Sequence, residues 1–162
     1  MRYLRHLFDL GAARRSFPAS TLDAIQHAIH ASETQHHGEI VFAVEGSLSL
    51  AHLWRGGGAR DRAREVFSHL RVWNTEHNTG VLVYVLLAER AIEIVADRGI
   101  AAKVAQARWD EICVTMQQHF GAGEFERGAI AGIEAISAIL VSAFPADGST
   151  DRDELPDRPV VL

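Results

Sequence analysis

Three short apolar runs, rich in β-branched side chains, limit the folds open to this chain more than any other feature. They occupy residues 40–44, 81–87 and 92–96. Runs of this length and composition are typical of strands that a sheet buries on both faces. Only residues 88–91 separate the second run from the third. So short a connection predicts an antiparallel hairpin.

A helical pattern lies between the first and second runs. Residues 59–72 carry an apolar stripe at helical spacing. Strands joined through a helix are parallel, and their crossover is right-handed. The sequence therefore predicts an α/β fold with a mixed sheet, made of a parallel βαβ unit and an antiparallel hairpin. Further helices are predicted over residues 20–33, 106–120 and 124–144.

Composition sets the size and class of the protein. The chain has 162 residues, 48% of them hydrophobic, which is enough for one domain with a real core. A formal charge of −5 argues against a nucleic-acid-binding protein that relies on a basic surface. The single cysteine, Cys113, excludes an internal disulfide, and its apolar helical surroundings predict a buried, inert thiol. Trp54, Trp73 and Trp109 are expected to anchor the core or its rim.

The chain divides into three parts by composition. Residues 1–18 are predicted to form a packed segment and a loop, and residues 19–145 the domain itself. Residues 146–162 read as an acidic, proline-containing tail. The apolar end of that tail, residues 160–162, either packs on this domain or docks on a partner or an open sheet edge.

No segment is typical of export or membrane insertion. Polar residues and Pro18 follow Arg14 and Arg15, where a signal peptide needs an uninterrupted apolar stretch. Residues 129–144 are apolar but contain Glu134, and they are too short to span a bilayer. We therefore expect a cytoplasmic protein without direct membrane insertion.

Several segments, in this order along the chain, resemble the TPM domain family. They are residues 38–44, 63–73, 78–83 with 90–100, and 120–132. The last of them matches the family's pattern of an aromatic residue and spaced glycines at the start of its final helix. The family is found in bacterial envelope proteins and in a thylakoid-lumen protein involved in photosystem repair.

The resemblance implies a fold and a range of activities. The fold is an α/β sandwich, with a small mixed sheet between helices. Divalent-cation binding, mainly of calcium, is associated with some members, and acid phosphatase activity with a plant member. Ala101 stands where relatives have a glutamate. Most relatives also carry a signal peptide or a C-terminal membrane helix.

Strand polarity brings polar residues from two segments to one edge of the predicted sheet. The strand at 81–87 begins where its antiparallel partner at 92–96 ends, and His36 and His37 precede the parallel first strand. Oxygen donors suit a hard cation such as Ca²⁺ or Mg²⁺. The candidate metal ligands are Asn74, Glu76, Asn78 and Asp97, with His77 as a further candidate. The alternative is an ordinary polar loop, in which Asn78 caps a turn and Asp97 pairs with Arg98 at the surface.

The opposite edge offers a weaker candidate for anion binding. Arg55, Gly57, Gly58 and Arg60 lie between the end of the first strand and the start of a helix. Exposed amides and a helix dipole can hold an anion there. The segment lacks the lysine and hydroxyl pair of a P-loop. A flexible connection is the alternative.

No nucleophile stands out, so the sequence favours a binding function. We expect a soluble TPM domain that binds a divalent cation, recognises a protein partner, or does both. That partner is another protein, with a membrane-associated one among the alternatives. The alternative function is a metal-dependent acid phosphatase acting on phosphomonoesters, with Asp97 or Glu76 as ligand and His77 as acid.

Overall fold

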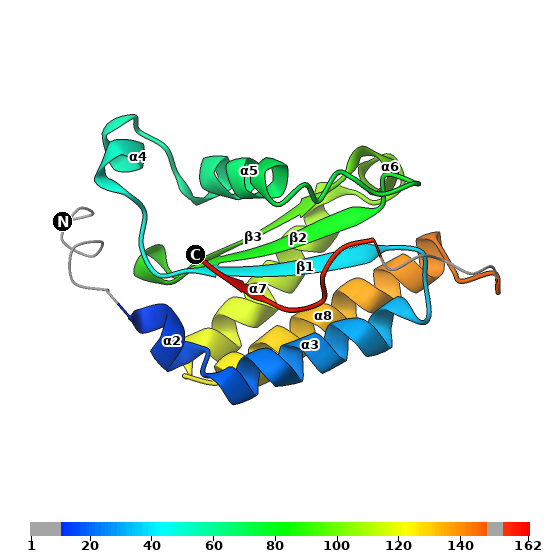
Figure 1. Cartoon of the computed structure of the whole chain (residues 1–162), viewed down its shortest axis with the longest axis horizontal. Coiled ribbons are helices and arrows are strands. Elements are labelled where there is room, and N and C mark those ends of the chain that lie inside the picture. The colour runs from blue at the N-terminus through cyan, green and yellow to red at the C-terminus, as the bar shows by residue number, and fades with distance from the viewer. Residues whose placement is uncertain (1–10, 149–153) are drawn as a thin grey trace.

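A small sheet between two layers of helices organises the computed structural model, which describes residues 11–148 and 154–162 (Figure 1). The sheet has four strands in the order β3-β2-β1-β4. Their bounds are Glu39–Glu45 for β1, Gly80–Leu86 for β2, Ala91–Ala96 for β3 and Val160–Val161 for β4. The apolar patch predicted within residues 1–10 lies outside the described residues.

The pairing of the strands confirms the predicted mixed sheet. β1 and β2 are parallel, with Ile40 opposite Val81. β2 and β3 form the antiparallel hairpin, with Val83 opposite Ile94. β4 pairs with the free side of β1 in parallel, over two residues of each strand. The apolar end of the predicted tail therefore packs on this domain's own sheet.

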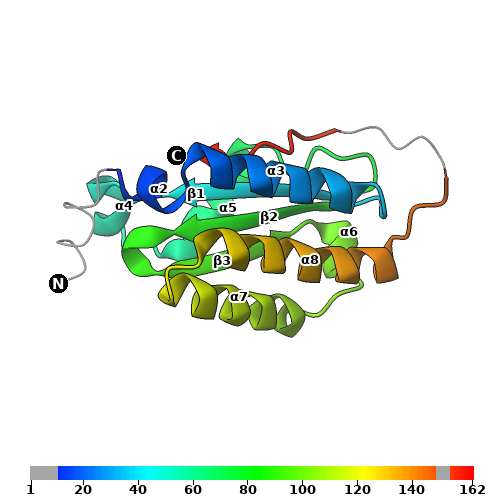
Figure 2. The ribbon, with the colours of Figure 1, turned by 90° about the horizontal axis from the view of Figure 1, so that it is seen from below.

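Helices cover both faces of the sheet. Figure 2 shows α3 (Ala19–Glu33), α7 (Gln106–Gly121) and α8 (Phe125–Ala143) side by side on one face. On the other face lies α5 (Ala59–His69), which belongs to the connection between β1 and β2. The remaining elements are short: α2 (Ala12–Ser16), α4 (Leu50–Trp54), η1 (Leu87–Glu89) and α6 (Arg98–Ala101).

The two central strands serve two separate cores. Phe42 and Val83 belong to a cluster with Trp109 of α7 on the three-helix side. Val41 and Leu82, one residue earlier on each strand, belong to the cluster on the α5 side. Successive side chains of a strand point to opposite faces, so a strand covered on both faces needs apolar residues throughout. This explains the unbroken apolar runs.

Two of the three tryptophans do not occupy the positions expected of them. Trp109 is buried as predicted, with 2% of its surface exposed. Trp54 is 78% exposed and Trp73 is 50% exposed, so the prediction that they are anchors is wrong. The reason is their place in the fold: α4 projects beyond the end of the sheet, and Trp73 lies in the turn after α5 (Figure 1).

The close approach of Gly80, the first residue of β2, to the backbone of Val72 can be tested by substitution. An added Cβ there would lie 1.9 Å from the backbone oxygen of Val72, so Gly80→Ala must displace main chain. We expect it to lower the free energy of unfolding by about 3 kcal/mol in urea titrations. Gly121→Ala, at the end of α7 with no atom within 4 Å of its new Cβ, is the control. It should be neutral or stabilising by up to about 1 kcal/mol. Equal losses in both variants would contradict this account.

Candidate functional site

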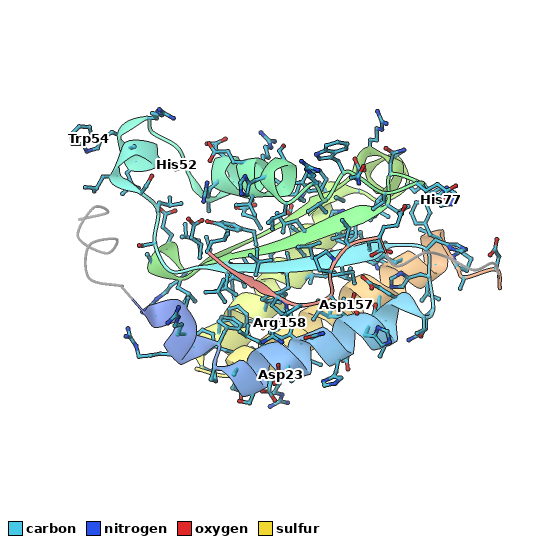
Figure 3. All side chains as sticks on the ribbon, viewed as in Figure 1. Asp23, His52, Trp54, His77, Asp157 and Arg158 are labelled. Carbon is cyan, nitrogen blue, oxygen red and sulfur yellow. The ribbon has the colours of Figure 1, made fainter. Side chains whose placement is uncertain are left out.

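Polar side chains gather at both ends of the sheet and leave its centre apolar. We call the end where β1 and β2 begin the amino end, and the end where they finish the carboxyl end. Figure 3 shows His77 at the amino end, and His52 and Trp54 at the carboxyl end. Each end holds one of the sites predicted from the sequence.

At the amino end, the structure brings two of the predicted metal ligands together around Arg98. Asn78 accepts a hydrogen bond from Arg98 Nε at 2.9 Å through its side-chain oxygen, and its backbone oxygen accepts from Gly99 N at 3.1 Å. Asp97 caps α6, because its Oδ1 accepts from Arg98 N at 2.7 Å. The other carboxyl oxygen, Asp97 Oδ2, is buried and has no hydrogen-bond partner.

The other predicted ligands face solvent. Asn74, Glu76 and His77 are exposed. The backbone N–H of Glu76 donates to both carboxyl oxygens of Glu154, at 2.9 and 3.2 Å. Among residues 11–148 and 154–162, no three His, Cys, Asp or Glu side chains are grouped to hold a metal ion. Metal binding by these residues therefore stays a prediction.

The histidines predicted at the same edge divide between surface and interior. The rings of His37 and His77 lie 6.3 Å apart, edge to face. His37 also contacts Asp147 at 3.2 Å. His36 is buried, and its ring nitrogens contact Ser32 Oγ at 2.8 Å and Gly38 N at 3.1 Å. Its visible role is to hold the connection between α3 and β1.

At the carboxyl end, the candidate anion residues point in different directions. Arg60 reaches back to β3, where Nη1 donates to Ile94 O at 2.7 Å and to Glu93 at 3.3 Å. Asp61 places a carboxylate at the start of α5, accepting from Gly58 N at 3.3 Å. That negative charge disfavours a bound anion at the same helix start. Arg55 is exposed.

A buried polar network that sequence reasoning missed lies beside this loop. Glu45, at the end of β1, is bound by Arg62 of α5 through two hydrogen bonds of 2.9 and 3.0 Å. Tyr84 of β2 donates its hydroxyl to the same carboxylate at 2.5 Å. Burial raises the pKa of Tyr84 well above its usual range, and the bond to Glu45 raises it further. The only sign of this network in the sequence is a glutamate at the end of an apolar run. Its pairing with Tyr84 and Arg62 could not be predicted, because it depends on the register of β1 against β2.

Cys113 behaves as the sequence predicts. It is buried, and burial raises the pKa of its thiol to about 12. A thiol with so high a pKa is protonated at neutral pH and is a poor nucleophile.

Most of the chain matches a known protein family. The profile of the TPM domain matches residues 14–139, which span the sheet from β1 to β3 and most of the helices. The chain belongs to the TPM domain family. The profile match ends before residues 154–162, so the segment that carries β4 lies outside it.

Solved structures agree with this assignment. The TPM domain is similar to the BA42 protein of the psychrophilic bacterium Bizionia argentinensis, with 32% identity and a TM-score of 0.78. That alignment covers 90% of this chain and 95% of BA42. An N-terminal domain from P. gingivalis shares the fold, with 16% identity, a TM-score of 0.63, and coverage of 78% and 77%. A search among curated proteins found no match.

The helices give one further result. Within the described part of the TPM domain, none is both long enough and apolar enough to cross a membrane.

The network at Glu45 predicts how stability depends on Arg62. Arg62→Met leaves a buried carboxylate with only Tyr84 as partner, so we expect a loss of about 2 kcal/mol in urea titrations. Replacing the carboxylate as well, in Glu45→Gln/Arg62→Met, should recover most of that loss. The control is Arg64→Met, an exposed arginine on the same helix, which should change stability by less than about 0.5 kcal/mol. Additive losses in the double variant would contradict the pairing.

Proposed function

We propose that this TPM domain is an interaction module that binds another protein through α4. The observation that supports the proposal is the exposure of Trp54, which is 78% exposed, beside Leu50, which is 47% exposed. Both side chains lie on one face of α4, because residues four apart meet on a helix surface. Figure 3 shows Trp54 pointing away from the body of the domain.

The rest of α4 holds this face in position. Leu53 is 2% exposed and belongs to the core on the α5 side, so it anchors the helix. Ser49 caps the helix by accepting a hydrogen bond from His52 N at 3.3 Å. Exposed aromatic side chains on a fixed support are favourable binding centres, because little conformational entropy is lost when a partner covers them. Scattered single apolar residues, by contrast, are ordinary on protein surfaces.

A photo-crosslinking amino acid at position 54 tests the proposal in the native host. We expect a discrete protein adduct from position 54, and its loss when Leu50→Ala is added. The same amino acid at position 114 is the control, because Val114 is also exposed, at 52%, but lies on α7. Equal adducts from positions 54 and 114, or none from position 54, would argue against a partner at α4.

A second function, divalent-cation binding at the amino end, has its own supporting observation. Asp97 Oδ2 is buried without a hydrogen-bond partner, which is costly for a carboxylate unless a cation or water satisfies it. We propose Ca²⁺ or Mg²⁺ as the cation, because carboxylate, amide and water oxygens are the ligands that these ions prefer. Glu76 and Asn74 would approach only by movement of their exposed loop, while the Arg98 guanidinium weakens binding by repulsion.

An amide NMR titration with Ca²⁺, Mg²⁺ and Zn²⁺ tests the cation site. We expect Ca²⁺ or Mg²⁺ to shift the amides of residues 76–80 and 97–99. Asp97→Asn should abolish these shifts and leave the fold intact, because asparagine still caps α6. Asp61→Asn, which removes a carboxylate from the carboxyl end, should leave them unchanged. An absence of shifts at millimolar cation would rule the site out.

Two further predictions from the sequence concern catalysis and location. Phosphatase activity and a cytoplasmic location stay predictions, and neither gains support from the contacts described above.

A further inference from the structure

The C-terminal segment, residues 154–162, crosses the open side of β1 and is held there by few backbone contacts. β4 pairs only Val160 and Val161 with β1, and Leu162 N donates to Val44 O at 2.8 Å. Earlier in the segment, Leu155 is buried in the core on the α5 side. Figure 1 shows the segment running beside β1 toward the C-terminus. So short a strand needs other contacts to stay in place.

Side-chain contacts of an unusual kind lie midway along the segment. Asp157 contacts His30 of α3 at 3.0 Å and lies within hydrogen-bond reach of Glu33, which is one turn later on the same helix. Glu33 accepts a hydrogen bond from Ile40 N at 2.7 Å, so its position is fixed by β1. Glu39 of β1 is also buried nearby, where it accepts from the backbone N–H groups of Glu154 and Leu155, each at 3.3 Å.

One carboxyl oxygen of Asp157 lacks a hydrogen-bond donor if Asp157 and Glu33 are both ionised. Its side chain is only 10% exposed, and Oδ2 contacts His30 Nδ1 at 3.0 Å. Its other oxygen, Oδ1, is buried and has no donor. Two carboxylates cannot hydrogen-bond each other, whereas a carboxylic acid and a carboxylate can. One proton shared between Glu33 and Asp157 would satisfy the buried oxygen.

We propose that Glu33 and Asp157 form a proton-dependent clasp, which holds residues 154–162 against β1 when Glu33 is protonated and releases them as pH rises. In the closed form Glu33 donates its proton to Asp157 Oδ1, while Asp157 Oδ2 contacts His30. Release would leave Ala43 and Val44 unpaired on the free side of β1. An unpaired strand edge can accept another extended segment.

The surroundings of Glu33 favour the proton. Burial is the main cause that raises the pKa of Glu33 to about 9, and the negative charges of Glu39 and Asp157 raise it further. The hydrogen bond from Ile40 N acts in the opposite direction and lowers it. The other charged groups of the segment are engaged elsewhere: Glu154 accepts from Glu76 N, and Arg158 donates to Asp23 and Gln26. A metal ion between the two carboxyl groups is the alternative explanation. Within residues 11–148 and 154–162, however, no three His, Cys, Asp or Glu side chains are grouped to hold one.

The sign of the pH dependence follows from the raised pKa. The closed segment keeps the Glu33 proton up to about pH 9, whereas an exposed glutamate loses it near its ordinary value of 4.5. Between these values the closed form binds one proton more than the open form. The closed-to-open ratio should therefore fall about tenfold per pH unit over this window and level off above it. Closure is strongest in acid and weakest in alkali.

Hydrogen exchange of the Leu162 amide measures that ratio directly. Its protection factor, corrected for the intrinsic exchange rate, should fall about tenfold per pH unit between about pH 6 and pH 9 in the wild-type chain. Glu33→Gln keeps the bond from Ile40 and donates an amide N–H to Asp157 at any pH. Its protection should be independent of pH. Asp157→Asn, which donates to an ionised Glu33, should behave likewise if Glu33→Gln does not fold.

A matched variant separates the clasp from a general loss of charge. Glu134→Gln removes one exposed glutamate from α8 and should keep the wild-type slope. Equal slopes in the wild type, Glu33→Gln and Asp157→Asn would overturn the proposal. So would a loss of Leu162 protection on adding EDTA at neutral pH, because a cation and not a proton would then join the two carboxyl groups.

Discussion

The parallel pairing of β1 with β2 is the constraint on which the other elements depend. Seven consecutive residue pairs, from Glu39–Gly80 to Glu45–Leu86, join two strands that are buried along their whole length. A shift of one residue would exchange the side chains of the two cores. The pairing therefore fixes which residues face α5 and which face the three-helix layer. It also fixes which loops meet at each end of the sheet.

Local patterns in the sequence were enough to predict this framework. The apolar runs identified β1, β2 and β3, and helical spacing placed α3, α7 and α8 within a few residues, because burial selects the side chains at each position. β4 could not be assigned in the same way. Two valines after an acidic, proline-containing stretch carry no period, and their pairing depends on the free side of β1. The exposure of Trp54 was missed because composition alone does not show that α4 extends beyond the sheet.

The candidate sites were predictable only as far as strand polarity determines them. Polarity placed Asn78 beside Asp97, and the structure joins both to Arg98. It did not show that Asn74 and Glu76 face solvent, because loop side chains follow contacts specific to this chain. The partners of Glu45 and Glu33 come from other elements, so their spacing in the sequence carries no signal.

Glu45, which is buried, and Glu33, which is partly buried, show how the same side chain can serve opposite purposes at the two ends of β1. Glu45 is the last residue of β1, and Glu33 ends α3 and accepts a hydrogen bond from Ile40 near the start of β1. Glu45 meets the guanidinium of Arg62, whose charge does not change across the physiological range, so the bond is permanent. Glu33 faces the carboxyl group of Asp157, and the two can form a hydrogen bond only when one of them carries a proton. The contact at the carboxyl end is therefore independent of pH over the physiological range, whereas the proposed attachment of the C-terminal segment to β1 depends on pH.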